Sequence, residues 1–128
     1  MTGNARAHIT VDQGADFGLQ LVWTDQNNQP YRVVHPCRMQ VRANTGQCIL
    51  DVVSHASPGN PRLVYSSDGG VIQVVVSSSV TRRLPVGKHN FDLLASYEDE
   101  VNGVRRIAKV LSGTLTVEPT LTTELPTL

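Results

Sequence analysis

The abundance of β-branched residues is the feature that most constrains this fold. Val, Thr and Ile make up 33 of the 128 residues, and their side chains lose rotamer freedom in helices but fit the pleated surface of a sheet. Between turn signals, apolar and polar residues alternate with the period of two that is typical of strands. We therefore expect an all-β domain. The expected strands cover residues 7–11, 17–23, 37–43, 48–54, 71–77, 89–97, 104–111 and 113–117, of which the last two could form one bulged strand, and residues 63–65 could add a short one.

The same alternation predicts which side chains form the core. Successive side chains of a strand point to opposite faces, so alternate apolar residues share one face. The strand over residues 37–43 has the pattern expected of a sheet with one solvated face. Its inward residues are Cys37, Met39 and Val41, its outward residues are Arg38, Gln40 and Arg42, and the other inward rows are Phe17, Leu19, Leu21 and Trp23, then Ile72, Val74 and Val76, then Phe91, Leu93 and Ala95.

Local turn signals indicate antiparallel connections. Residues 44–46, Asn-Thr-Gly, separate two alternating runs, and glycine supplies the positive φ that a tight hairpin needs. Residues 98–103 end in Asn-Gly and predict a second reversal, which pairs the strand over residues 89–97 with the next one. Residues 77–84 predict a short helical turn, because serines can cap its start and Pro85 stops it within about two turns. About seven short strands at regular spacing predict a sandwich.

Charge and hydropathy argue against several classes of function. Eleven Lys and Arg residues balance eleven Asp and Glu residues, so no net positive charge draws the chain to nucleic acid or to an anionic membrane. The longest apolar runs, such as residues 74–76, fall far short of the roughly 20 residues needed to span a bilayer. The first seven residues contain one basic residue and no apolar core. We therefore expect no secretory signal and synthesis in a cytosol.

The cysteines and histidines show no spacing typical of a bridge or a metal site. A hairpin centred on Thr45 pairs residues whose numbers sum to about 90, which offsets Cys37 from Cys48 along the two strands. That offset exceeds the reach of a disulfide, so we expect free buried thiols. The four histidines, which lack the spacings of zinc ligands, are His8, His35, His55 and His89.

The remaining polar clusters have simpler explanations than catalysis. The serines at residues 77–79 lack the nucleophile-elbow pattern and suit a helix cap. The acidic run at residues 98–100 is expected to solvate a hairpin, and the arginine pairs at 82–83 and 105–106 lack the interleaved aromatic residues that stack bases. We therefore expect a non-enzymatic protein with no catalytic, cofactor-binding or metal-ligating residue and no small-molecule substrate.

Several stretches together carry a family resemblance. They are Gly-Ala-Asp-Phe at 14–17, which opens a strand leading to Asp25 and Pro30; Arg-Met-Gln-Val-Arg at 38–42; Asp-Gly-Gly-Val-Ile at 68–72; residues 81–93, where a helical turn precedes Leu-Pro-Val-Gly and a Phe-Asp-Leu triplet; and a closing Gly-Thr-Leu-Thr-Val at 113–117 followed by Glu-Pro. Over roughly residues 12–122 the chain resembles small tailed-bacteriophage virion proteins related to the immunoglobulin-like N-terminal domain of baseplate upper proteins. It departs from their pattern at residues 32–36.

The resemblance implies a fold and a place of action. It implies an immunoglobulin-like antiparallel β-sandwich over residues 1–117, and residues 118–128, which lack sustained alternation, are expected to form an extended C-terminal arm. It further implies a virion structural protein, an adaptor or accessory subunit of the tail, baseplate or neck that joins neighbouring proteins or anchors fibres. Such a chain is incorporated into the virion after synthesis in the bacterial host cytoplasm. Its expected partners are other virion proteins and copies of itself.

Two other functions remain open at the level of sequence. A capsid decoration protein keeps the phage context but changes the place. A carbohydrate-binding module is less expected, because the sole tryptophan, Trp23, points inward and leaves Tyr31 and Tyr65 as the expected exposed aromatic residues.

The C-terminal arm is the segment we expect to hold a partner. Residues 118–128 retain three apolar residues, Leu121, Leu125 and Leu128, which a purely solvating tail would not need. Extended segments of this kind bind exposed sheet edges by backbone pairing. We therefore expect the arm to dock on a neighbouring subunit, with packing on its own domain as the alternative.

Overall fold

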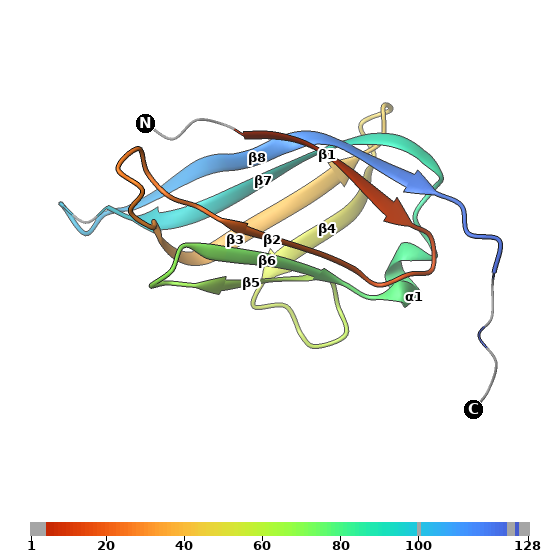
Figure 1. Cartoon of the computed structure of the whole chain (residues 1–128), viewed down its shortest axis with the longest axis horizontal. Helices are drawn as coiled ribbons and strands as arrows, with labels where there is room; N and C mark the ends of the chain where they lie inside the picture. Colours follow the sequence, from red (N-terminus) through yellow and green to blue (C-terminus); the bar gives the residue numbers. More distant parts are fainter. Residues whose placement is uncertain (1–4, 100, 123–124, 126–128) are drawn as a thin grey trace.

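The computed structural model describes residues 5–99, 101–122 and 125 (Figure 1). Within these residues lie eight strands and one short helix. In chain order they are β1 (Ala5–Asp12), β2 (Phe17–Val22), β3 (Arg32–Arg42), β4 (Cys48–Ser54), β5 (Arg62–Ser66), β6 (Val71–Val76), α1 (Ser78–Thr81), β7 (Gly87–Glu98) and β8 (Arg105–Glu118). No helix in this described part is long and apolar enough to cross a membrane. The all-β class is confirmed.

The strands form where apolar and polar residues alternate, and their bounds differ from the expected ones by up to five residues. β3 begins five residues earlier than expected and crosses the cis peptide between His35 and Pro36, where its pairing with β7 shifts register. β8 joins the two runs expected at residues 104–111 and 113–117 into one strand, with a bulge between Lys109 and Leu111. The short strand considered at residues 63–65 is present as β5.

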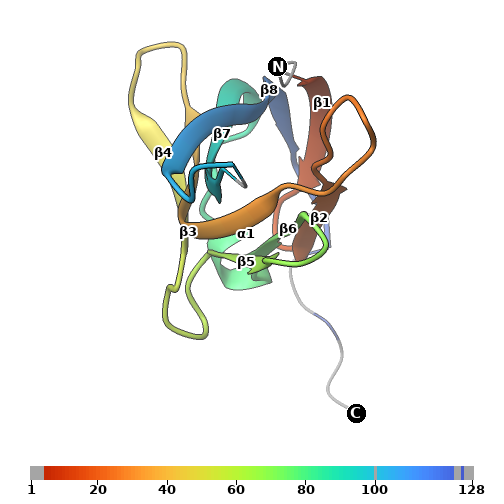
Figure 2. The same ribbon diagram turned by 90° about the vertical axis from the view of Figure 1, so that its left-hand side faces the viewer.

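All the described strands belong to one sheet, in the order β1-β8-β7-β3-β4-β5-β6-β2. The sheet curls so that its strands surround a common core (Figure 2). β1 and β2 follow one another in the sequence, yet they form the two opposite edges of this sheet. Consecutive strands at opposite edges can close a curled sheet only if they pair, and no pairing joins these two among the described residues.

Two strand pairs are parallel, which corrects the expectation of a purely antiparallel sheet. β1 runs parallel to β8 along its whole length. Gly113 permits this approach, because its φ is 153° and a Cβ there would collide with the backbone carbonyl of Ala7. β4 and β5 overlap over two residue pairs, where the loop over residues 55–61 brings the start of β5 beside the end of β4. The expected hairpins at residues 44–46 and 98–103 do form antiparallel connections.

The core lies on the inner face of the curled sheet. The inward rows expected for β3, β6 and β7 are buried, and Trp23 is buried as well. Phe17, Leu19 and Leu21 differ from that expectation, because they are only half-buried. β2 has a single strand neighbour, β6, among the described elements. An edge strand lacks the cover that a second neighbour would supply, which explains the partial exposure of this row.

The helical turn α1 forms as expected, but a different residue caps it. Ser77 occupies the N-cap position, yet among the described residues its side chain makes no cap bond and lies 2.9 Å from the Ser79 hydroxyl. The backbone N–H of Ser78 instead donates to the carboxylate of Asp16, at 2.7 Å. An N-cap acceptor satisfies one of the first free N–H groups of a helix. The expectation of serine capping is therefore wrong, and Asp16, from the turn between β1 and β2, supplies the acceptor.

A second set of hydrogen bonds fixes α1 against the same turn. The fully buried Thr81 hydroxyl accepts the N–H of Gly14 at 3.0 Å and lies 2.8 Å from the carbonyl of Ala15. The Gln13 side chain donates to the carbonyl of Leu84, also at 2.8 Å. Hydrogen bonds to α1 and to the segment just after it therefore fix the position of the turn at residues 13–16.

Candidate functional site

The C-terminal arm leaves the sheet beside the β1–β2 turn. Gln13 donates its backbone N–H to the carbonyl of Glu118, at 2.9 Å, where β8 ends. Beyond this point Leu121 is 98% exposed and Leu125 is 86% exposed, whereas Leu128 lies outside the described residues. A groove of about 620 Å³ separates the arm from residues 13–16 and Arg82. The two described leucines of the arm thus contribute almost nothing to the core of their own domain.

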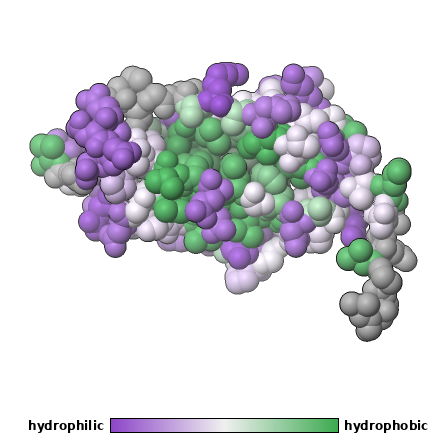
Figure 3. Space-filling view, in the orientation of Figure 1, coloured by the Kyte–Doolittle hydropathy of each residue, from purple (hydrophilic) through white to green (hydrophobic). Residues whose placement is uncertain are grey.

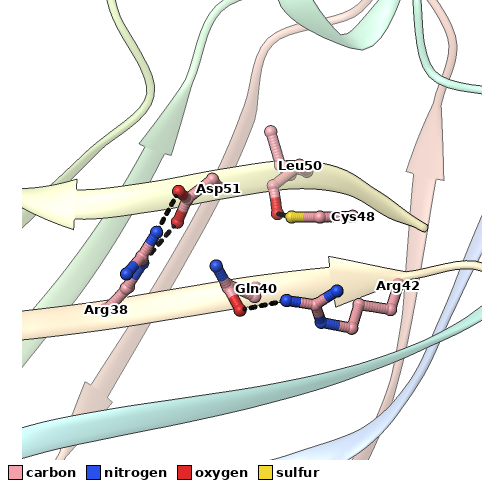
Figure 4. Close-up of polar contacts among 6 residues, drawn as sticks. All are labelled: Arg38, Gln40, Arg42, Cys48, Leu50 and Asp51. Carbon is pink, nitrogen blue, oxygen red and sulfur yellow. Dashed lines mark hydrogen bonds and ion pairs between the residues drawn. The ribbon is translucent and has the colours of Figure 1, made fainter. Parts of the chain in front are cut away.

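A polar network covers the outer face of β3 and β4 (Figure 4). The Arg38 guanidinium donates twice to the Asp51 carboxylate, with distances of 2.8 and 2.6 Å. These bonds hold the pKa of Asp51 below its usual value. Arg42 donates to the side chain of Gln40 at 3.0 Å and to the carbonyl of Gly46 at 2.8 Å. The arginines expected to face outward do so, and each has a partner within the hairpin.

A second ion pair lies on the same outer face, on β7 and β8. Gln40 lies opposite Asp92, whose carboxylate is 3.9 Å from Lys109 on β8. Charges of both signs therefore alternate across this outer face and neutralise one another locally. Such a face offers no concentrated field for a highly charged ligand, but it offers many donors and acceptors to a polar protein surface.

The aromatic residues pack on one another instead of forming an exposed platform. Tyr31 stacks on Trp23 with ring centroids 4.2 Å apart, and Tyr97 meets both rings edge-on. Tyr31 and Tyr65 are half-buried, which corrects their expected exposure. A hollow of about 240 Å³ lies beside Tyr31 and Tyr97, but it is also lined by the ion pair of Arg32 with Glu98. The tyrosine faces are largely used within the domain.

Two histidines that looked scattered in the sequence come together. The imidazoles of His35 and His55 stack with centroids 4.2 Å apart and planes within 5°. Ser54 accepts the N–H of Cys37 at 2.9 Å and lies 2.7 Å from Nδ1 of His35, and His55 contacts the Tyr65 hydroxyl at 3.1 Å. The antiparallel pairing of β3 with β4 ends at Arg38 and Val53, so the hairpin register alone does not predict this contact. The spacing motifs of metal sites could not reveal it.

The other two histidines lie apart from this pair. His8 on β1 bonds through Nδ1 to the Thr114 hydroxyl of β8. His89 is buried, its Nε2 lies 2.8 Å from the carbonyl of Pro85, and its Nδ1 has no hydrogen-bond partner in the described part of the chain. Across the described ranges, no group of three or more His, Cys, Asp or Glu side chains is placed to hold a metal ion.

The acidic run that begins at the last residue of β7 stabilises its own hairpin. The carboxylate of Asp99 accepts the backbone N–H of Val101 at 2.9 Å and pairs with Arg106 at 3.1 Å. The bond from Val101, and then the one from Arg106, lower the pKa of Asp99 from its usual value. Glu98 pairs with Arg32 at 3.4 Å, whereas Glu100 lies outside the described residues. Two of these carboxylates thus have structural partners within the domain.

Both cysteines are free thiols within the described structure. Cys48 lies opposite Arg42, as the hairpin rule predicts, and is half-buried. Cys37 is fully buried, and burial raises the pKa of its thiol. A raised pKa lowers the thiolate fraction at neutral pH, so Cys37 has the character of a core residue rather than of a nucleophile.

The sequence was also compared with known proteins. No model of a protein family matches the chain, and no curated protein sequence matches it.

Proposed function

We propose that this chain is a non-enzymatic structural subunit of a tailed-bacteriophage particle, an adaptor or accessory protein of the tail, baseplate or neck. The observation that carries the proposal is the C-terminal arm, which extends from a self-contained sheet with Leu121 and Leu125 almost fully exposed. Exposed apolar side chains on an extended segment favour binding to another protein. The family resemblance of residues 12–122 supplies the context of the virion.

We also propose that the curled sheet is an immunoglobulin-like sandwich. Variable-type immunoglobulin domains place strands G, F, C and C′ in one layer and strands D, E and B in the other. If the eight strands are named A, B, C, C′, D, E, F and G in chain order, the observed order β8-β7-β3-β4 reads G-F-C-C′, and β5-β6-β2 reads D-E-B. This order supports the assignment. β4 and β5 are paired over only two residue pairs, and in this assignment that short pairing lies where one layer ends and the other begins.

The polar outer face supports a role in assembly. Its charged groups, such as Arg38 with Asp51, are already paired, so a partner surface can approach without leaving an isolated charge buried. The face and the arm lie on different parts of the domain. One subunit can therefore contact two neighbours, as an adaptor must.

The test is mass spectrometry of purified phage particles from cells that produce either the full chain or a chain truncated after Glu118. We expect the full chain in the particles and at least a tenfold depletion of the truncated one, on the order of the effect of losing two buried leucines. Particles that lack the full chain altogether would refute the proposal. A copy number in the tens to hundreds that follows capsid symmetry, in place of the small multiples of three or six of a tail component, would identify a decoration protein instead.

A further inference from the structure

The two edges of the sheet leave an apolar seam. β1 pairs with β8 and β2 pairs with β6, while no described strand pairs with the other edge of either. The inward rows of interior strands are almost fully buried, with Ile72 and Val74 of β6 at 0% exposure. The corresponding row of β2, formed by Phe17, Leu19 and Leu21, stays half-buried. This row has the apolar sequence of a core strand, but no second described strand lies beside β2 to cover it.

The surface shows the same gap. Hydrophobic side chains gather at the centre of the face in Figure 3, over β2 and between β2 and β1. In an edge strand, every second residue directs its backbone N–H and C=O away from the paired neighbour. The seam therefore offers both unpaired backbone groups and an apolar floor. These are the two requirements for the addition of an extended strand.

The C-terminal arm has the pattern that such a seam would bind. Leu121 and Leu125 are four residues apart, so in an extended strand they lie on the same face, and Thr120 and Thr122 lie on the other. The leucines are 98% and 86% exposed on their own domain. The arm thus carries unpartnered apolar side chains, and the same chain carries an uncovered apolar row.

The geometry favours an exchange between copies over folding back. Glu118, where β8 ends, lies opposite Asp12 at the closed end of the seam, next to the turn that joins β1 to β2. From there residues 119–122 run away from the sheet (Figure 1). To enter its own seam, the arm would have to pass the end of β1, which lies between β8 and the seam, and reverse its direction at once.

We propose that the arm of a second copy of this chain lies along the free edge of β2, with Leu121 and Leu125 against the row formed by Phe17, Leu19 and Leu21, and that the two copies exchange arms reciprocally. This inference names the neighbour in the proposed function and rests on it only for the biological context. Reciprocal exchange buries the leucines of both arms and covers the apolar rows of both seams. It also closes the assembly as a twofold dimer.

The test uses sedimentation velocity on the full chain and on two complementary variants. Leu121→Asp with Leu125→Asp disables the arm but leaves the seam, whereas Leu19→Glu disables the seam but leaves the arm. We expect the full chain to dimerise, each variant alone to associate at least about tenfold more weakly, and a mixture of the two to form a heterodimer through its one intact junction.

Matched controls place the same charges on the opposite faces. Thr120→Asp with Thr122→Asp adds two charges to the outer side of the arm, and Val22→Glu adds one to the outward, 60% exposed side of β2. Both controls should dimerise like the full chain. Dimerisation that survives the arm and seam variants, or that is lost equally in the controls, would overturn the proposal.

A peptide-binding experiment tests the same contact without requiring the Leu19→Glu variant to fold. A labelled peptide of residues 118–125 is titrated with the chain truncated after Glu118, and binding is followed by fluorescence anisotropy. We expect saturable binding that the unlabelled peptide competes away and that a peptide with Asp at 121 and 125 does not. Absence of binding and of dimerisation would refute the second-copy proposal. Arm-dependent incorporation into particles would still stand in that case, with a different virion protein as the partner.

Discussion

At the scale of single residues, Gly113 shows how one missing side chain sets a strand pairing. Its φ of 153° lies in the region that disfavours all residues except glycine, and the backbone of Ala7 occupies the space that a Cβ would need. No local turn requires glycine at this position, because it lies inside β8. The requirement comes from β1, which packs along β8 in parallel.

Gly113→Ala should therefore destabilise the domain by about 2 kcal/mol or more, through backbone strain and displacement of β1. A drop in Tm of roughly 5–15 °C should accompany this loss. Gly46→Ala is the matched control, because Gly46 also has a positive φ, 90°, but a Cβ there would meet nothing within 4 Å. Thermal and urea denaturation measure both variants. Equal losses in the two would show that β1 does not approach β8 as described.

The ion pair of Arg38 with Asp51 predicts a dependence of stability on pH. The pKa of Asp51 is lowered in the folded protein, so the pair stabilises the fold above the ordinary carboxyl pKa, about 4. This contribution disappears as the pH falls through the lowered value. Asp51→Asn should cost less than about 1 kcal/mol at pH 7, because both side chains are partly exposed.

Urea denaturation at pH 7 and at successively lower pH measures this difference, which should shrink as the Asp51 carboxylate becomes protonated. Asp92→Asn removes a carboxylate from the same face whose partner, Lys109, is 3.9 Å away, and should cost less at pH 7. A difference between Asp51→Asn and the unmodified chain that stays the same as the pH falls through the acid range would contradict the role of the charged pair.

At the scale of elements, α1 is defined by its contacts with a distant turn. Four residues are too few for a helix to be stable by itself. Asp16 caps its first turn, and the Thr81 hydroxyl bonds to Gly14 and Ala15. These bonds connect two segments more than 60 residues apart in the sequence, so α1 fixes the position of the β1–β2 turn.

Asp16→Ala should accordingly destabilise the domain by about 1 kcal/mol, the usual cost of losing an N-cap acceptor. Ser77→Ala should change the stability by no more than about 0.5 kcal/mol, although Ser77 occupies the N-cap position, because its side chain makes no cap bond in the described structure. Chemical denaturation measures the free energy of unfolding of both variants. A larger loss in Ser77→Ala than in Asp16→Ala would restore the serine cap expected from the sequence.

At the scale of the whole molecule, the last described strand, β8, ends before the arm begins. Val117 is the last buried residue of β8, and the described leucines that follow it are exposed. The arm can therefore be removed without exposing any core residue in the described part of the domain. This agrees with the proposed role of the arm in binding another molecule.

Deletion of residues 119–128 should leave the Tm of the monomer within a few degrees, about the effect of less than 1 kcal/mol. Val117→Asp is the contrasting variant, since it buries an unpaired charge and should unfold or severely destabilise the domain. Calorimetry at concentrations where the chain is monomeric measures both, because association would raise the apparent stability. A large loss of Tm on deletion would assign the arm to its own core.

Local sequence determined the strands of this protein, because alternation with a period of two is a property of neighbouring residues. It predicted the buried rows of β3, β6 and β7, the hairpin at residues 44–46 and the helical turn before Pro85.

The order of the strands, their edges and the cap of α1 were decided only by the tertiary structure. The row Phe17, Leu19 and Leu21 has the sequence of a core strand, but its burial depends on whether another strand lies beside β2. The parallel approach of β1 to β8 depends on space at Gly113, and the choice of Asp16 over Ser77 depends on a turn some 60 residues away. Alternation specifies which face of a strand is apolar, whereas the long-range packing of the whole chain decides what covers that face.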